Sequence, residues 1–187
     1  RFGIDVQDLA ALKPFLGPPL RDSFMEFYGM SPEEADRAVA VSREYFVPRG
    51  MFENELYPGI PELLAATAAA GRVNVIATSK PQPFAERIAA HFGIDRHFRL
   101  ISGSTFDGRR KTKADVIRHA LSALGIAPGE AVMIGDRRYD VEGAAEEGLP
   151  AIAVEWGYAP PGELEAARPL RIVPDVETLR RLLLGNE

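Results

Sequence analysis

Two aspartates, Asp136 and Asp140, stand four residues apart just after the apolar segment 131–134. Carboxylate oxygens are the ligands that a hard cation such as Mg²⁺ prefers, and Mg²⁺ usually keeps several waters when it binds a protein. The structural alternative places Asp136 in a turn and Asp140 at the cap of the next helix. For Asp140 both roles are compatible, whereas an apolar strand running straight into Asp136 favours a functional carboxylate. The pattern predicts a metal site at these two residues.

A lysine and a hydroxyl group stand at comparable places earlier in the chain. Lys113 begins the helix predicted after Thr112, where its charge opposes the helix dipole. That local disadvantage favours a role as counter-charge for phosphate or carboxylate, although a solvated basic loop formed with 109–111 is the alternative. Thr78 follows the apolar segment 73–77 and precedes a helix whose free amides could help it bind a phosphate oxygen. A simple helix cap is the more common role for such a hydroxyl.

Hydrophobic periodicity predicts the elements that must position these residues. Short apolar strands alternate with amphipathic helices from residue 58 onward. The predicted strands are 73–77, 99–102, 131–134, 151–154 and 171–173, and the helices are 61–70, 83–92, 112–124, 141–147 and 176–184. This alternation indicates an α/β fold with a Rossmann-like parallel sheet covered on both faces. Because ligands bind at the carboxyl ends of such strands, we expect the candidate residues to meet at that edge.

Residues 1–57 follow a different pattern, which is helical and contains no convincing strand. One helix is predicted over 20–28. A second begins at Ser31, where Pro32 at the first helical position and Glu34 complete a capping box. We therefore predict two domains, a helical one over 1–57 and an α/β one over 58–187.

Composition narrows the possible partners. The 187 residues include no cysteine, which excludes disulfides and thiolate metal sites, and only three histidines, which disfavours zinc. A net charge of −5 argues against nucleic acid as a partner but not against a small phosphorylated substrate. No apolar run approaches the length of a membrane span. We expect a cytoplasmic monomer or homodimer that binds neither nucleic acid nor membrane.

The order of hydroxyl, lysine and Gly-Asp-x-x-x-Asp resembles motifs two, three and four of the haloacid dehalogenase superfamily. The resemblance is closest to its phosphoglycolate-phosphatase-like members and covers essentially the whole chain. The matching segments are 57–61, Ala77-Thr78-Ser79-Lys80-Pro81, Thr112-Lys113-Ala114-Asp115, Gly135-Asp136-Arg137-Arg138-Tyr139-Asp140 and Trp156-Gly157-Tyr158. The resemblance implies that 1–57 is a helical cap and 58–187 the catalytic core.

The resemblance also implies an activity and individual roles. The activity is Mg²⁺-dependent hydrolysis of a small phosphomonoester through an aspartyl-phosphate intermediate. Thr78 would hydrogen-bond the transferring phosphoryl group, and Lys113 would neutralise its charge. Asp136 would bind Mg²⁺ directly, with Asp140 in support. Further candidates for phosphate or substrate contacts are Ser79, Lys80 and Arg21.

One family motif has no counterpart in this chain. The family's first motif, a strand ending in Asp-x-Asp-Gly-Thr, supplies the nucleophile, and nothing in 1–57 matches it. Asp5 and Asp8 have no strand before them. We therefore expect an N-terminally truncated cap and a sheet without its central first strand, about 20 residues in all. The prediction is a phosphatase that is inactive as the 187-residue chain, with weak Mg²⁺ affinity.

Alternative functions lie both within the phosphatase class and outside it. Within the enzyme class, a 5'-nucleotidase or a sugar phosphatase could replace a phosphoglycolate phosphatase, because the cap decides the substrate. From a different class, a non-catalytic binding module or pseudoenzyme would keep the fold without the nucleophile. A two-component receiver domain is disfavoured because its acidic residues come first in the chain. A dinucleotide-binding domain is disfavoured because no Gly-x-Gly-x-x-Gly follows any strand.

Overall fold

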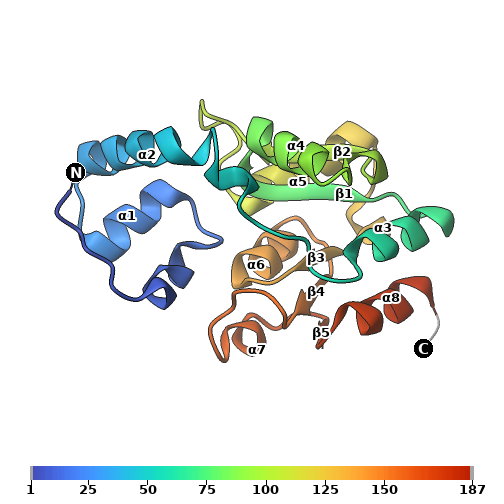
Figure 1. Ribbon diagram of the computed structural model, residues 1–187. Helices are drawn as coiled ribbons and strands as arrows, with labels where there is room; N and C mark the ends of the chain where they lie inside the picture. Colours follow the sequence, from blue (N-terminus) through green and yellow to red (C-terminus); the bar gives the residue numbers. More distant parts are fainter. Residues whose placement is uncertain (1, 186–187) are drawn as a thin grey trace. The chain divides into compact units, whose positions relative to one another are not determined.

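A helical unit forms the N-terminal part of the computed structural model, which describes residues 2–185 (Figure 1). This unit ends at Asn54 and a second compact unit begins at Glu55. Its elements are a 3-10 helix (Leu9–Phe15), α1 (Leu20–Tyr28), α2 (Pro32–Phe46) and a 3-10 helix (Gly50–Phe52). The predicted capping box starts α2, since Ser31 Oγ accepts from Glu34 N at 3.2 Å and Ser31 N donates to Glu34 Oε2 at 2.9 Å. No strand lies within residues 2–54, as expected.

The second unit alternates helices and strands, which confirms the predicted α/β class. Its helices are α3 (Ile60–Ala69), α4 (Gln82–His91), α5 (Lys113–Leu124), α6 (Arg138–Glu146), α7 (Glu163–Ala167) and α8 (Val176–Leu184). Its strands are β1 (Val75–Pro81), β2 (Leu100–Ser104), β3 (Met133–Gly135), β4 (Ala151–Val154) and β5 (Arg171–Val173). Short 3-10 helices occupy Asp95–His97 and Pro128–Glu130. The sequence reading omitted α7, because five residues are too few to show a helical period.

All strand pairs are parallel, but they form two hydrogen-bonded sheets instead of the single sheet expected. One sheet contains β1 and β2, and the other has the order β3-β4-β5. Within residues 2–185, β1 and β3 therefore each have one edge without a strand partner. The absence of a central strand between them stays a prediction. Helices α4 and α5 pack on β1 and β2, α6 packs on β3 and β4, and α3 packs on α8 (Figure 1).

Strand β4 lies at the centre of the hydrophobic core and is buried along its whole length. Ile152 and Val154 belong to a cluster with Leu63, Val173 and Leu179. Ala151 belongs to a second cluster with Ile117, Val141, Ala144 and Leu149. Because successive side chains of a strand point to opposite faces, β4 packs against helices on both sides. Its uninterrupted apolar run made it the easiest strand to predict.

Two element boundaries differ from the predicted ones near the candidate residues. Strand β1 continues to Pro81, so Thr78 lies within it and not after it. Pairing continues because β2 also extends, with Thr78 opposite Gly103 and Pro81 opposite Ser104. Helix α6 begins at Arg138, three residues before the predicted start, because the Asp140 carboxylate accepts from the backbone N of Arg137 and closes the first turn.

His119, in α5, is partly buried beside Ser102. The buried Ser102 hydroxyl donates to Val116 O at 2.7 Å, so at 2.9 Å it must accept a proton from His119 Nδ1. Desolvation, and the nearby charge of Arg110, lower the pKa of His119 below its usual value.

This burial predicts a pH dependence of stability. The folded state disfavours protonated His119, whereas the unfolded chain binds that proton near pH 6.5. Stability should therefore fall as the pH drops through the ordinary histidine range, and this contribution should level off below the folded-state pKa. Urea unfolding at several pH values would show a weaker loss in His119→Gln. His91→Gln, a change at an exposed histidine, is the control, and equal pH dependence in both variants would contradict the prediction.

Candidate active site

A buried ion pair between α5 and α6 links three elements of the second unit. Lys113 is the first residue of α5, which Thr112 caps by accepting from Asp115 N at 3.1 Å. Lys113 Nζ lies 2.7 Å from Asp140 Oδ1, and the two side chains are only 13% and 9% exposed. Lys113 Nζ also donates to Ala77 O in β1 at 3.0 Å. The lysine and the second aspartate of the predicted site are thus in direct contact, beside the residue that precedes Thr78.

Both carboxylate oxygens of Asp140 are engaged. Oδ1 pairs with Lys113, and Oδ2 accepts from Arg137 N at 3.0 Å. Asp140 therefore caps α6 and anchors Lys113 at the same time. Direct binding of a cation by Asp140 would have to displace one of these partners, so the geometry favours the supporting role.

The other aspartate, Asp136, immediately follows β3 and keeps one oxygen open. Its Oδ2 accepts from Tyr158 N at 2.8 Å, and Oδ1 has no hydrogen-bond partner within residues 2–185. Burial raises the pKa of Tyr57, and contact with Tyr158 and the charge of Asp136 raise it further. Tyr57 and Tyr158 therefore belong to the surroundings of this carboxylate.

Magnesium commonly binds through one or two carboxylates, waters and substrate phosphates. The open oxygen of Asp136 fits such a site as the single direct protein ligand. Within the described residues there is no group of three or more histidine, aspartate or glutamate side chains that could hold a metal ion unaided. Any cation here would depend on waters, on substrate or on ligands from outside those residues.

Three glycines allow these charged side chains to approach the backbone. A Cβ added at Gly135 would lie 2.2 Å from Asp140 Cγ, and one added at Gly157 would lie 2.1 Å from Asp136 Cβ. A Cβ at Gly143 would lie 2.7 Å from Lys113 Cβ. Sequence reasoning did not assign these roles. A glycine in a helix interior costs stability relative to alanine, so Gly143 within α6 was the available signal.

The phosphate-binding candidates on β1 follow the residue that Lys113 contacts. The Thr78 hydroxyl accepts from Lys80 N at 3.1 Å, and no acceptor for its own proton lies within residues 2–185. Ser79 O accepts from Ser104 Oγ at 2.8 Å. Desolvation by the neighbouring protein lowers the pKa of Lys80, although its side chain still reaches solvent. Thr78 can therefore donate to a phosphate oxygen without losing its present contact.

Arg21 belongs to the helical unit, where it already has partners. Its Nε lies 2.7 Å from Asp36 Oδ1, and the hydrogen bond to that carboxylate raises the pKa of Arg21. A second contact joins its guanidinium to Met25 Sδ at 3.4 Å. Contact between Arg21 and a substrate stays a prediction.

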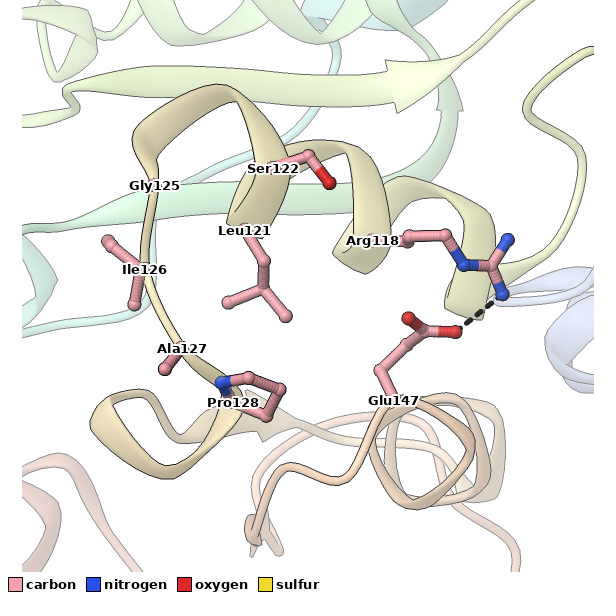
Figure 2. Close-up of a pocket in the computed structure, with 8 residues that line it drawn as sticks. All are labelled: Arg118, Leu121, Ser122, Gly125, Ile126, Ala127, Pro128 and Glu147. Carbon is pink, nitrogen blue, oxygen red and sulfur yellow. Dashed lines mark hydrogen bonds and ion pairs between the residues drawn. The ribbon is translucent and has the colours of Figure 1, made fainter.

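A surface pocket of about 460 Å³ lies at the opposite end of α5 from Lys113 (Figure 2). It is lined by Arg118, Leu121, Ser122, Gly125, Ile126, Ala127, Pro128 and Glu147. At one side Arg118 donates to Glu147 Oε1 at 2.5 Å. None of the predicted site residues lines this pocket, so it is distinct from the candidate active site.

Among the helices that the structure describes, none is long and apolar enough to cross a membrane.

Comparisons with known proteins show which family this chain is similar to. A family model described as haloacid dehalogenase-like hydrolase matches residues 6–148. The 5'-nucleotidase of Pseudomonas aeruginosa is 45% identical over 183 residues, which cover 98% of this chain and 83% of that protein. A predicted phosphatase from Clostridium acetobutylicum superposes with a TM-score of 0.95 at 44% identity, covering 98% of this chain and 85% of that one. Protein tyrosine kinase A of Mycobacterium tuberculosis superposes with a TM-score of 0.82 at 36% identity, covering 97% and 84%.

Proposed function

The chain belongs to the haloacid dehalogenase-like hydrolase family, and on that basis we propose that it is a phosphatase that hydrolyses small phosphomonoesters with Mg²⁺ as cofactor. The observation that carries the proposal is the convergence of Lys113, Asp140 and the Ala77 carbonyl beside Thr78, with an open carboxylate oxygen on Asp136. These are the groups that binding and neutralising a phosphoryl group requires.

Each residue contributes a separate physical effect to that chemistry. Lys113 holds a positive charge in a largely water-excluded place, where electrostatic attraction to a phosphate is stronger than in bulk water. Asp140 and the Ala77 carbonyl restrict the position of that charge before substrate arrives. The Thr78 hydroxyl proton can donate to a phosphate oxygen. Mg²⁺, when bound beside Asp136, would offset the repulsion between an attacking carboxylate and the phosphate.

The attacking carboxylate of the proposed aspartyl-phosphate step is not supplied by any matching motif in residues 1–187. We therefore retain the prediction that the chain alone turns over little substrate. The non-catalytic binding module is the competing function, because it would keep the Lys113 site and lack the nucleophile.

The substrate class that we place first is a nucleoside 5'-monophosphate. Support comes from the 45% identity to the Pseudomonas aeruginosa 5'-nucleotidase over nearly the whole chain. Phosphoglycolate, the substrate that the sequence motifs favoured, comes second. The phosphoglycolate phosphatase of Cupriavidus necator is 27% identical over 167 residues. Sugar phosphates are the third candidate substrate class.

Release of inorganic phosphate from these three ester classes, with and without Mg²⁺, tests the proposal. We expect no release above the blank from the 187-residue chain. The same chain extended at its N-terminus by a strand ending in Asp-x-Asp-Gly-Thr should release phosphate only when Mg²⁺ is present. An extension carrying Asn in place of the first aspartate is the matched control. Measuring free phosphate distinguishes transfer to water from transfer to a protein side chain. If the extended protein releases none from any ester, the phosphatase proposal fails.

A further inference from the structure

The turn after β4 contacts the Asp136 carboxylate through its backbone. The backbone N–H of Tyr158 donates to Asp136 Oδ2 at 2.8 Å. Asp136 follows β3 and Tyr158 follows β4, and these two strands are parallel neighbours in one sheet. Both residues therefore lie at the carboxyl edge of that sheet. One oxygen of Asp136 is held by a backbone group that lies 22 residues further along the chain.

Gly157, the residue before Tyr158, lies against the same carboxylate. A Cβ added at Gly157 would lie 2.1 Å from Asp136 Cβ and 2.3 Å from Asp136 Oδ2. The φ of Gly157 is not positive, so its backbone conformation does not itself require glycine. What position 157 requires is the absence of a side chain, which allows the backbone to lie directly on Oδ2.

The two oxygens of Asp136 are therefore not equivalent. Oδ2 lies against Gly157 and accepts from the Tyr158 amide, whose hydrogen is the positive end of the peptide dipole. A cation at Oδ2 would have to displace that hydrogen bond and approach the positive end of the dipole. Oδ1 has no hydrogen-bond partner within residues 2–185. Asp136 can thus offer a cation one oxygen, Oδ1.

A carboxylate that offers one oxygen suits Mg²⁺ better than Ca²⁺. Mg²⁺ is small, demands nearly ideal octahedral geometry and usually keeps several waters, so one carboxylate oxygen is enough to hold it. Ca²⁺ takes about six to eight oxygen ligands in a more flexible geometry, and both oxygens of one carboxylate often bind it together. A protein can therefore favour Mg²⁺ by withholding the second oxygen of a carboxylate ligand.

We propose that the peptide unit between Gly157 and Tyr158 makes Asp136 a one-oxygen ligand and thereby favours Mg²⁺ over Ca²⁺ at this site. The inference rests on the proposed function, because it requires that a divalent cation binds at Asp136. Gly157 and Tyr158 are positioning residues, since they act on the cation only through the Asp136 carboxylate. The choice of cation is then made by a backbone group that itself contributes no ligand.

Replacing Tyr158 with proline removes the N–H and tests this role. NMR titrations of the ¹⁵N-labelled chain with Mg²⁺ and with Ca²⁺ give a midpoint for each cation. The indole N–H of Trp156, the only tryptophan, gives a single signal from the residue before Gly157. In Tyr158→Pro, Oδ2 is free to bind a cation together with Oδ1. We expect the Mg²⁺ midpoint to rise about 10- to 100-fold and the preference for Mg²⁺ over Ca²⁺ to fall by about tenfold or more.

Tyr158→Ala is the matched control, because it loses the same aromatic ring but keeps the backbone N–H. The ring is 46% exposed, so its loss should leave the ratio of the two midpoints within about threefold of that in the unaltered chain. A general loss of structure would weaken the binding of both cations alike. A change in their ratio is therefore a result that a merely structural role would not produce.

A second variant, Gly157→Ala, gives the answer if the proline variant does not fold. It keeps the Tyr158 N–H, but the new Cβ would overlap Asp136 Oδ2, so the carboxylate has to turn. We expect the same fall in the preference for Mg²⁺, because Ca²⁺ tolerates an altered ligand geometry better.

The outcomes separate this inference from the proposed function. An unchanged ratio in Tyr158→Pro, or in Gly157→Ala where the proline variant does not fold, would overturn the inference and leave the proposed function intact. An equal change of ratio in Tyr158→Ala would assign the preference to the ring and would overturn it as well, as would tighter binding of Ca²⁺ than of Mg²⁺ by the unaltered chain. If neither cation moves the Trp156 indole signal or any backbone amide signal of the unaltered chain, the metal part of the proposed function fails, and the inference fails with it.

Discussion

Replacing Lys113 with methionine is expected to destabilise the second unit by about 3–5 kcal/mol, because the change leaves a buried carboxylate without its counter-charge. Asp140 is only 9% exposed in its side chain, and Lys113 is its one ion-pair partner within the described residues. The Ala77 carbonyl would lose its hydrogen bond from Nζ as well. Urea unfolding followed by circular dichroism measures the loss, and an effect below about 1 kcal/mol would show that the pair is far more hydrated than its burial indicates.

The companion variant Asp140→Asn separates charge from capping. The amide oxygen of asparagine can still accept from Arg137 N, so the cap of α6 is retained. In Lys113→Met/Asp140→Asn no charge is left unpaired, and we expect the double variant to be more stable than Lys113→Met alone. Glu142→Gln, at a pair whose members are 48% and 49% exposed, should change stability by less than about 1 kcal/mol. Phosphate binding should stay lost in the double variant, because the positive charge is gone.

A methyl group at Gly135 is expected to have the second-largest effect. In Gly135→Ala the new Cβ would overlap Asp140, whose Cγ lies 2.2 Å away. The Asp140 side chain cannot adopt another rotamer without losing its contact with Lys113 or with the Arg137 amide. Overpacking typically costs about 1–3 kcal/mol, and disruption of the ion pair would add to that. We therefore expect both lower stability in urea and weaker phosphate binding.

The control for this variant is Gly129→Ala. A Cβ at Gly129 would meet no heavy atom within 4 Å, and its φ is not positive. Its replacement should leave stability unchanged or raise it by about 0.4–1 kcal/mol, because alanine restricts the unfolded chain. Equal stability of Gly135→Ala and Gly129→Ala would mean that the backbone of β3 shifts freely, contrary to the packing described above.

The architecture and the main candidate residues follow from local patterns. The apolar run of β4 and the capping boxes before α2 and α5 act over a few residues, so they can be seen without knowing the fold. The rule that ligands bind at the carboxyl ends of parallel strands then placed Lys113 near Asp140. Their contact at 2.7 Å agrees with that placement, while their catalytic roles stay proposals.

Contacts between distant residues were less predictable. Arg137 looked like an ordinary residue inside Gly-Asp-x-x-x-Asp, and its partner Glu163 is 26 residues away on a helix too short to predict. The length of β1 was also missed, because it depends on whether β2 continues beside it. Neither the Arg137–Glu163 contact nor the pairing of β1 with β2 can be identified from the residues next to each partner in the sequence.

The sequence by itself determined an α/β fold, the order of its strands and longer helices, and the pair of aspartates that follows β3. Periodicity, caps and short motifs are properties of residues close together in the sequence, so they can be recognised without the tertiary structure. Only the tertiary structure decided which distant groups contact each of the two aspartates. Asp140 is saturated by Lys113 and the Arg137 amide, whereas Asp136 keeps an oxygen open beside Tyr158. That difference arises from which distant groups approach each carboxylate, and close approach is set by packing of the whole unit.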